Sequence, residues 1–279
     1  MSLESKIGLG TVQFGVPYGI SNTSGQTSKE EVTKILNFAQ NHGISVLDTA
    51  SAYGNAEEIL GNNHIKGFKI VSKFMPPANG ESINQQLSKS LEKLQCQSLY
   101  GYLAHQPSNV VENPSQWDEL KELKYKGLIN KIGFSLYEPD ELITILDQDF
   151  VPDLIQVPFN YFDRRFEKLL IELKQTGCEI HSRSAFLQGL FFMNVNNLNS
   201  FFSPVKENIR RLQDENNNLA GSLLGFVVSQ NFIDKVIIGV ETTEQLRIDL
   251  TQLEETTMLP DLQTIIPADI LIPSRWPTN

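Results

Sequence analysis

The sequence has few cysteines, and it lacks long apolar runs. Only two of its 279 residues are cysteine, Cys96 and Cys178, and they have no CxxC spacing, which is typical of a protein kept in a reducing cytoplasm. No stretch of about 18 uninterrupted apolar residues occurs, so the sequence offers no membrane-spanning helix. Residues 1–6 lack the basic and apolar pattern of a signal peptide. We therefore expect a cytoplasmic protein that does not associate with membranes.

Basic residues and histidines are also scarce. The 23 basic residues are outnumbered by 33 acidic ones, which gives a net charge of −10 and argues against nucleic acid as a partner. Of the four histidines, only His105 and His181 fall on predicted strands, too few for a metal centre. We expect a small-molecule substrate, no metal, and a monomer or weak homo-oligomer.

Short strand-like runs alternate with helix-like runs along the whole chain. This alternation predicts a (β/α)8 TIM barrel, in the α/β class, and the length of 279 residues suits a single domain over 1–279. No linker or low-complexity tract interrupts the pattern. The eight predicted strands are residues 6–12, 44–50, 68–74, 99–105, 129–135, 154–160, 179–185 and 235–240.

The predicted helices carry end signals and apolar stripes. A capping box, Ser28-Lys-Glu-Glu31, is expected to open one helix, Thr242 with Gln245 is expected to cap another, and Pro114 and Pro139 suit first turns. Residues 186–204 form a long irregular segment rich in Phe, Asn and Leu, which we expect to be a lid over cofactor or substrate. The apolar stripes are Val32, Ile35, Leu36 and Ala39; Ile83, Leu87, Leu91 and Leu94; and Leu246, Leu250 and Leu253.

Four side chains of complementary chemistry lie at or just past the ends of predicted strands: Asp48 and Tyr53, then Lys73, then His105. The carboxyl ends of barrel strands face one mouth, so these four residues are expected to converge. A tyrosine hydroxyl can donate a proton to a carbonyl oxygen, but its ordinary pKa of about 10 is too high without help. A neighbouring lysine ammonium eases loss of the proton, a carboxylate holds the lysine, and a histidine orients the carbonyl.

This tetrad resembles that of the aldo-keto reductase superfamily, in which Asp, Tyr, Lys and His occur in this order. The likeness runs from Gly8-Leu-Gly-Thr-Val-Gln-Phe-Gly15 to Gly239-Val-Glu-Thr-Thr-Glu-Gln-Leu246. It implies reduction of an aldehyde or ketone with hydride from a nicotinamide and a proton from Tyr53. A side chain cannot supply hydride, so a cofactor is required. Gly8-x-Gly10 is followed by Gln13 instead of the third glycine of a Rossmann fingerprint, as expected for this family.

The resemblance also implies which residues bind the cofactor. Ser135 and Gln156 would hold the carboxamide, and Arg183 stands where many members stack a tyrosine on the nicotinamide ring. Where many members have Asn after the serine, this chain has Leu136. The full implied set is Thr11, Ser135, Gln156, Arg183, Ser184, Gln188, Gly189, Gly239, Val240, Glu241, Thr242, Gln245 and Asp249.

The residues after the last predicted strand bear on the choice of cofactor. NADP(H) is the family default, with Lys, Arg or Ser at the 2′-phosphate site. Here Val240 and Leu246 cannot donate, and Glu241 would repel a phosphate while suiting ribose hydroxyls. Arg247 lies near. These residues favour NAD(H) binding at least comparable to NADP(H), and the choice stays open.

Other functions and the substrate also stay open. A metal-dependent barrel lyase would need more histidines, and a barrel glycosidase would need a second strand-end carboxylate beside Asp48. A cofactor-binding sensor or slow pseudo-enzyme of the same fold remains an alternative. Segments 10–19 and 272–276 resemble bacterial aldo-keto reductases associated with surface-polysaccharide sugar biosynthesis, which implies a sugar-derived carbonyl as one candidate substrate. The predicted substrate-binding aromatics are Phe14, Tyr18, Tyr161 and Phe162.

Overall fold

Eight parallel strands close into a barrel in chain order, from β1 to β8 and back to β1. The computed structural model describes residues 3–22, 24–78, 80–262 and 264–277. Each predicted strand is found, shorter at its ends in most cases, so the predicted (β/α)8 fold is confirmed. The strands are β1 (Ile7–Gly10), β2 (Val46–Asp48), β3 (Lys69–Phe74), β4 (Leu99–Ala104), β5 (Ile129–Ser135), β6 (Leu154–Pro158), β7 (Glu179–Arg183) and β8 (Lys235–Gly239).

Alternation along each strand separates the inside of the barrel from the layer under the helices. A small apolar cluster of Val46, Val71, Leu103, Leu154 and Ile237 fills the middle of the barrel. The remaining strand residues mostly pack outward against the helices in a much larger cluster. Polar side chains at the carboxyl ends of the strands lie beyond this apolar cluster and are available for chemistry.

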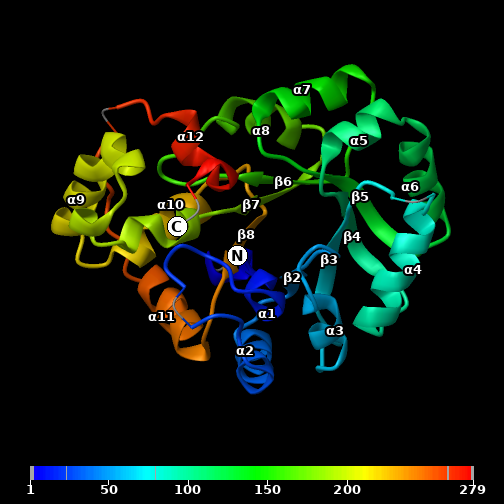
Figure 1. The fold of residues 1–279 in the computed structure, drawn as a ribbon, viewed down its shortest axis with the longest axis horizontal. Helices are drawn as coiled ribbons and strands as arrows, with labels where there is room; N and C mark the ends of the chain where they lie inside the picture. The colour runs from blue at the N-terminus through cyan, green and yellow to red at the C-terminus, as the bar shows by residue number, and fades with distance from the viewer. Residues whose placement is uncertain (1–2, 23, 79, 263, 278–279) are drawn as a thin grey trace.

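Helices surround the barrel, as Figure 1 shows. Thr242 caps its helix through Gln245 N–H as predicted, but the capping box at Ser28 is only half formed. Ser28 accepts from Glu31 N–H, whereas the Glu31 carboxylate instead accepts from Thr243 N–H at 2.7 Å, joining two neighbouring helices. The α-helices are α1 (Val12–Gly15), α2 (Lys29–Asn41), α3 (Ala56–Gly61), α4 (Ile83–Leu94), α5 (Pro107–Glu112), α6 (Ser115–Tyr125), α7 (Pro139–Asp147), α8 (Glu167–Lys174), α9 (Lys206–Glu215), α10 (Leu219–Val228), α11 (Thr243–Leu253) and α12 (Ala268–Leu271).

The segment after β7 leaves the regular pattern and packs with the C-terminal part of the chain. It forms the 3₁₀ turns η2 (Leu187–Phe192), η3 (Val195–Asn197) and η4 (Ser200–Val205) and leads into α9. Its apolar residues, with α9 and α12, form a second core, and Figure 1 places α9 and α12 on the same side of the barrel. Among the described residues, no helix is both long enough and apolar enough to cross a membrane.

Candidate active site

The four predicted catalytic side chains meet at the carboxyl ends of β2, β3 and β4. Lys73 Nζ lies 2.9 and 2.7 Å from the two carboxylate oxygens of Asp48 and donates to Thr49 O at 3.1 Å. It also lies 3.3 Å from the Tyr53 hydroxyl oxygen. The rings of Tyr53 and His105 are 5.8 Å apart, edge to face. The predicted convergence of the tetrad is confirmed.

Two glycines let the turn that carries Tyr53 lie against α1. A Cβ added to Gly15 would come within 1.8 Å of Tyr53 O. Gly54, which follows Tyr53, has φ of +56°, and a Cβ added there would come within 2.5 Å of Gly15 O. Only glycine tolerates both the left-handed backbone and this close approach. The motif that carries the tyrosine therefore also fixes its position.

Burial and the contacts within the tetrad act in opposite directions on the pKa of Tyr53 and of Lys73. Desolvation raises the pKa of Tyr53 above its ordinary value, and the Lys73 ammonium opposes this shift without reversing it. The expected easing by lysine is thus present but is outweighed in the protein alone. Burial disfavours the charge of Lys73, yet Asp48 and the Tyr53 oxygen raise the pKa of Lys73 overall, so the lysine stays charged.

His105 is held neutral by its surroundings. Desolvation, followed by the nearby Lys73 charge, lowers the pKa of His105 to about 4. Its Nδ1 atom is buried and has no partner among the described residues. A neutral imidazole beside Tyr53 can donate or accept one hydrogen bond, which suits it to orienting a substrate oxygen.

One cavity of about 610 Å³ opens above the tetrad. Asp48, Tyr53 and His105 line it, while Lys73 lies beneath with no exposed surface. The cavity runs to the ends of β7 and β8, so most of the implied cofactor residues share it. Those that line it are Thr11, Ser135, Gln156, Arg183, Ser184, Gln188, Gly189, Gly239, Glu241 and Gln245, together with the predicted substrate residue Tyr18.

The cavity lining leaves out several predicted residues. Phe14 is fully buried in the main core. Tyr161 and Phe162 belong to the second core, where the Tyr161 hydroxyl donates to Pro260 O at 2.5 Å. The prediction that these three aromatics contact substrate finds no support in this geometry, because their rings are packed inside the two apolar cores. Among the implied cofactor residues, Val240, Thr242 and Asp249 do not line the cavity, and Val240 is fully buried.

Gln156 and Arg183 make contacts that the sequence did not predict. The Gln156 amide donates to Asp48 Oδ1 at 2.7 Å, which ties an implied cofactor residue to the tetrad. The Arg183 guanidinium lies 4.4 Å from the centre of the Tyr137 ring and donates to Leu136 O at 2.9 Å. The backbone carbonyl of Leu136 therefore accepts a hydrogen bond from Arg183. The leucine side chain has no amide that could bind the cofactor carboxamide.

The backbone after β7 is strained where it borders the cavity. Ser184, Leu187 and Gln188 all have positive φ, at 64°, 46° and 53°, although none is glycine. Such conformations cost energy and persist where the surroundings enforce them. Gln188 Nε2 donates to the Tyr18 hydroxyl at 2.9 Å, so η2 and the loop after α1 meet beside the cavity. This placement supports the predicted covering role of residues 186–204.

The far end of the cavity, near α11, carries an acid and no lysine. Glu241 lines it, and burial raises the pKa of this carboxyl. Leu246 is fully buried. Arg247 pairs with Glu244 at 2.9 Å and is absent from the lining. Arg183, at the other end, is the cation among the described lining residues.

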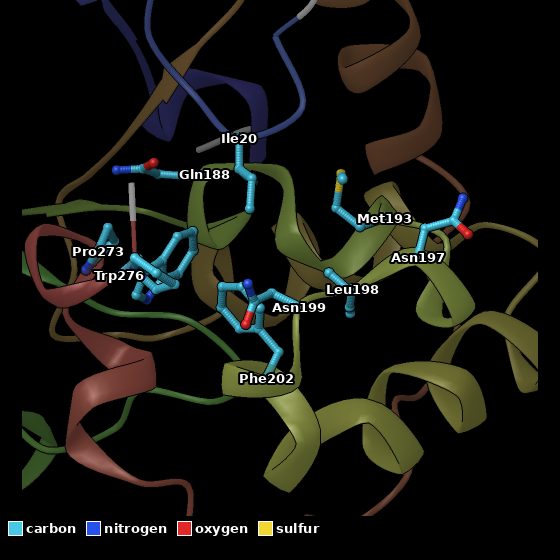
Figure 2. Close-up of a pocket in the computed structure, with 10 residues that line it drawn as sticks. Ile20, Gln188, Met193, Asn197, Leu198, Asn199, Phe202, Pro273 and Trp276 are labelled. Carbon is cyan, nitrogen blue, oxygen red and sulfur yellow. The ribbon is translucent and has the colours of Figure 1, made fainter. Parts of the chain in front are cut away.

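Two smaller cavities adjoin the main one. One of about 300 Å³ shares Gln188 and Pro273 with it and is bordered by Phe202 and Trp276 (Figure 2). The other, of about 380 Å³, lies beside His105. Tyr137 and Ser274 were missed as site residues; Tyr137 follows a strand end, a recognisable signal, whereas Ser274 arrives from the C-terminal segment and has none.

The chain belongs to the aldo/keto reductase family, whose model matches residues 6–258. Aldo-keto reductase YhdN of Bacillus subtilis is 28% identical over 184 residues, 60% of this chain and 54% of that protein. The uncharacterized oxidoreductase YqkF of the same species is 25% identical over 273 residues, 87% of this chain and 85% of that protein. Aldo-keto reductase AKR11C1 from Bacillus halodurans, in its holo form, has the same fold, with a TM-score of 0.72 at 18% identity over 91% of this chain and 88% of that one.

Proposed function

We propose that the protein reduces an aldehyde or ketone to an alcohol with a nicotinamide cofactor, and that Tyr53 supplies the proton. The observation that carries the proposal is the buried chain from Asp48 through Lys73 to Tyr53, with contacts of 2.7 and 3.3 Å. Family membership, and the names of the relatives, support an oxidoreductase of this kind.

The residues around the cavity suit the cofactor that the resemblance implies. The amide of Gln156, the hydroxyl of Ser135 and the guanidinium of Arg183 border the end next to the tetrad, and Glu241 borders the other end. When bound, the cofactor would supply the hydride that no side chain can provide. Glu241 and the absence of a cation from the described lining near it favour NAD(H) at least comparably to NADP(H).

The chain's own residues would then handle the proton and the carbonyl. Neutral His105 would orient the carbonyl oxygen toward Tyr53. As that oxygen gains charge, Tyr53 would donate its proton, and Lys73 would stabilise the phenolate that remains. Asp48 would hold the ammonium in place. Burial raises the pKa of Tyr53, so its hydroxyl would stay protonated until a substrate oxygen accepts the proton.

The second candidate function is a cofactor-binding sensor or slow pseudo-enzyme of the same fold. It differs from the enzyme in turnover alone. The subgroup likeness of segments 10–19 and 272–276 makes a sugar-derived carbonyl a substrate worth testing first. We further propose that the protein works in the cytoplasm as a monomer or weak homo-oligomer, with no nucleic-acid partner.

The decisive assay follows oxidation of NADH and NADPH against a panel of carbonyls that includes free and nucleotide-linked sugars. Turnover above about 1 s⁻¹, the lower end of the range typical of enzymes, with any member of the panel supports the reductase. Tight cofactor binding with no turnover on the panel would favour the sensor.

A further inference from the structure

The cavity of about 380 Å³ beside His105 is the space left for a substrate once the proposed function is accepted. It shares Ala52, His105, Tyr137 and Ser274 with the main cavity. The main cavity is lined by the implied cofactor residues, whereas none of these lines the smaller one. A carbonyl held at Tyr53 and His105 would therefore extend its remaining atoms into the smaller cavity. This inference rests on the proposed function.

The far wall of this cavity is formed by an ion pair between two distant parts of the chain. Arg275, in η5 (Pro273–Arg275), donates from Nη2 to Glu138 Oε1 at 2.9 Å. Glu138 lies just before α7, so the pair joins the C-terminal segment to the loop after β5. Gln106 and Ser274 add uncharged polar groups to the lining, and Met75 and Ile272 add apolar ones.

Each charge in this wall is already paired with another protein group. Arg275 Nη1 contacts Asp269 Oδ1 at 3.2 Å. The second Glu138 oxygen accepts from Arg165, which also holds the buried Asp163 through two contacts of 2.9 Å. The linked set contains three carboxylates and two guanidinium groups, one more negative charge than positive. Neither arginine is left unpaired to receive an anion.

Two other cations close to His105, Arg183 and Lys73, are also engaged by protein groups. Arg183 stacks on Tyr137 and donates to Leu136 O, and it lines the main cavity instead of the smaller one. Lys73 is paired with Asp48. An anionic group at the far wall would therefore lose water and meet surplus negative charge.

We propose that Glu138 and Arg275 determine substrate specificity by selecting a carbonyl compound whose far end is polar and uncharged. Hydroxyl groups can donate to Glu138 and accept from Arg275, Gln106 and Ser274 without displacing the ion pair. A carboxylate or phosphate at the same place would be rejected.

The test compares two aldehydes of similar length, 4-hydroxybutanal and 4-oxobutanoate. Each concentration is expressed as the open-chain aldehyde measured by NMR, because 4-hydroxybutanal largely closes to a cyclic hemiacetal. We expect kcat/KM to be higher for the neutral compound by about tenfold or more, from like-charge repulsion at short range. Glu138→Gln and Asp269→Asn each remove one negative charge. Each should lower the ratio of kcat/KM for the neutral compound to kcat/KM for the anionic one by about threefold to tenfold. The Asp269 side chain is 67% exposed, so this second variant leaves the fold least disturbed.

Glu207→Gln is the matched control, because Glu207 pairs with Arg210 on the exposed face of α9. The ratio of the two kcat/KM values in this variant should equal that of the wild type. An equal or higher kcat/KM for 4-oxobutanoate, or a ratio that Asp269→Asn and Glu138→Gln leave unchanged, would overturn the inference. Reduction of neither compound by a protein that reduces other carbonyls would overturn it as well. Failure to reduce any carbonyl would instead count against the proposed function.

Discussion

Gln156 Nε2 lies 2.7 Å from Asp48 Oδ1, so the residue implied to hold the nicotinamide carboxamide is also hydrogen-bonded to the proposed catalytic tetrad. Both side chains are buried. Because Asp48 in turn holds Lys73, a change at Gln156 should reach the proton donor as well as the cofactor.

Replacing Gln156 with leucine tests this link. The variant leaves one carboxylate oxygen of a buried ion pair with one donor fewer, which should lower the free energy of unfolding by about 1–3 kcal/mol. Turnover should fall together with cofactor affinity. Thermal or urea unfolding and NADH titration give the two readouts. Gln175→Leu, at an exposed helix end, serves as the control, and equal stability of the two variants would contradict the link.

The protonation of His105 predicts a flat pH dependence near neutrality. Since burial lowers its pKa to about 4, the ring is neutral at every pH above about 5. We expect no loss of kcat/KM between pH 8 and pH 5.5 that can be assigned to this histidine. A step with an apparent pKa near 6.5 that disappears in His105→Gln would show that the ring is charged when it works.

Asp249 should make the protein less stable as the pH rises. Burial raises its pKa from 3.8 to about 7, and its Oδ2 has no partner among the described residues. The folded state therefore binds a proton that the unfolded state releases, so stability falls between about pH 4 and pH 7 and levels off above that range.

Asp249→Asn removes this penalty. It should stabilise the fold at pH 8 by on the order of 2–4 kcal/mol and should change little at pH 4. Chemical unfolding of both proteins at the two values measures the difference. A gain that is equal at pH 4 and pH 8 would mean that protonation is not its cause.

Glu241 should set the balance between the two cofactors. The wild type is expected to bind NADH at least comparably to NADPH. Glu241→Lys replaces repulsion of the 2′-phosphate by a charge-assisted contact, worth about 1.5–3 kcal/mol, and should shift the Kd ratio toward NADPH by tenfold or more. Glu254→Lys, at the exposed end of α11, is the control. A wild-type preference for NADPH of a hundredfold would show that another cation compensates.

The sequence predicted those features that depend on short local patterns. Eight apolar runs bounded by Gly, Pro or polar residues defined the strands, and strand ends in a barrel share one mouth, so Asp48 and Lys73 could be brought together without coordinates. Phe14 was misplaced because one sequence position cannot reveal whether a loop aromatic faces the mouth or the core. Ser274 and Arg275 were missed because their place depends on how the C-terminal segment folds back over the barrel.

Turnover by Tyr53→Phe tests the central claim most directly. The variant keeps the ring and its packing against His105, so cofactor affinity should be preserved, while loss of the proposed proton donor should reduce kcat by about 10²–10⁴-fold or more. Lys73→Met should reduce kcat nearly as much, and Asp48→Asn should reduce kcat less. The measurement is kcat on the best substrate beside the Kd for NADH, in the wild type and in Tyr53→Phe. A kcat near the wild-type value with unchanged cofactor affinity would mean that another acid operates and that the tetrad has been assigned wrongly.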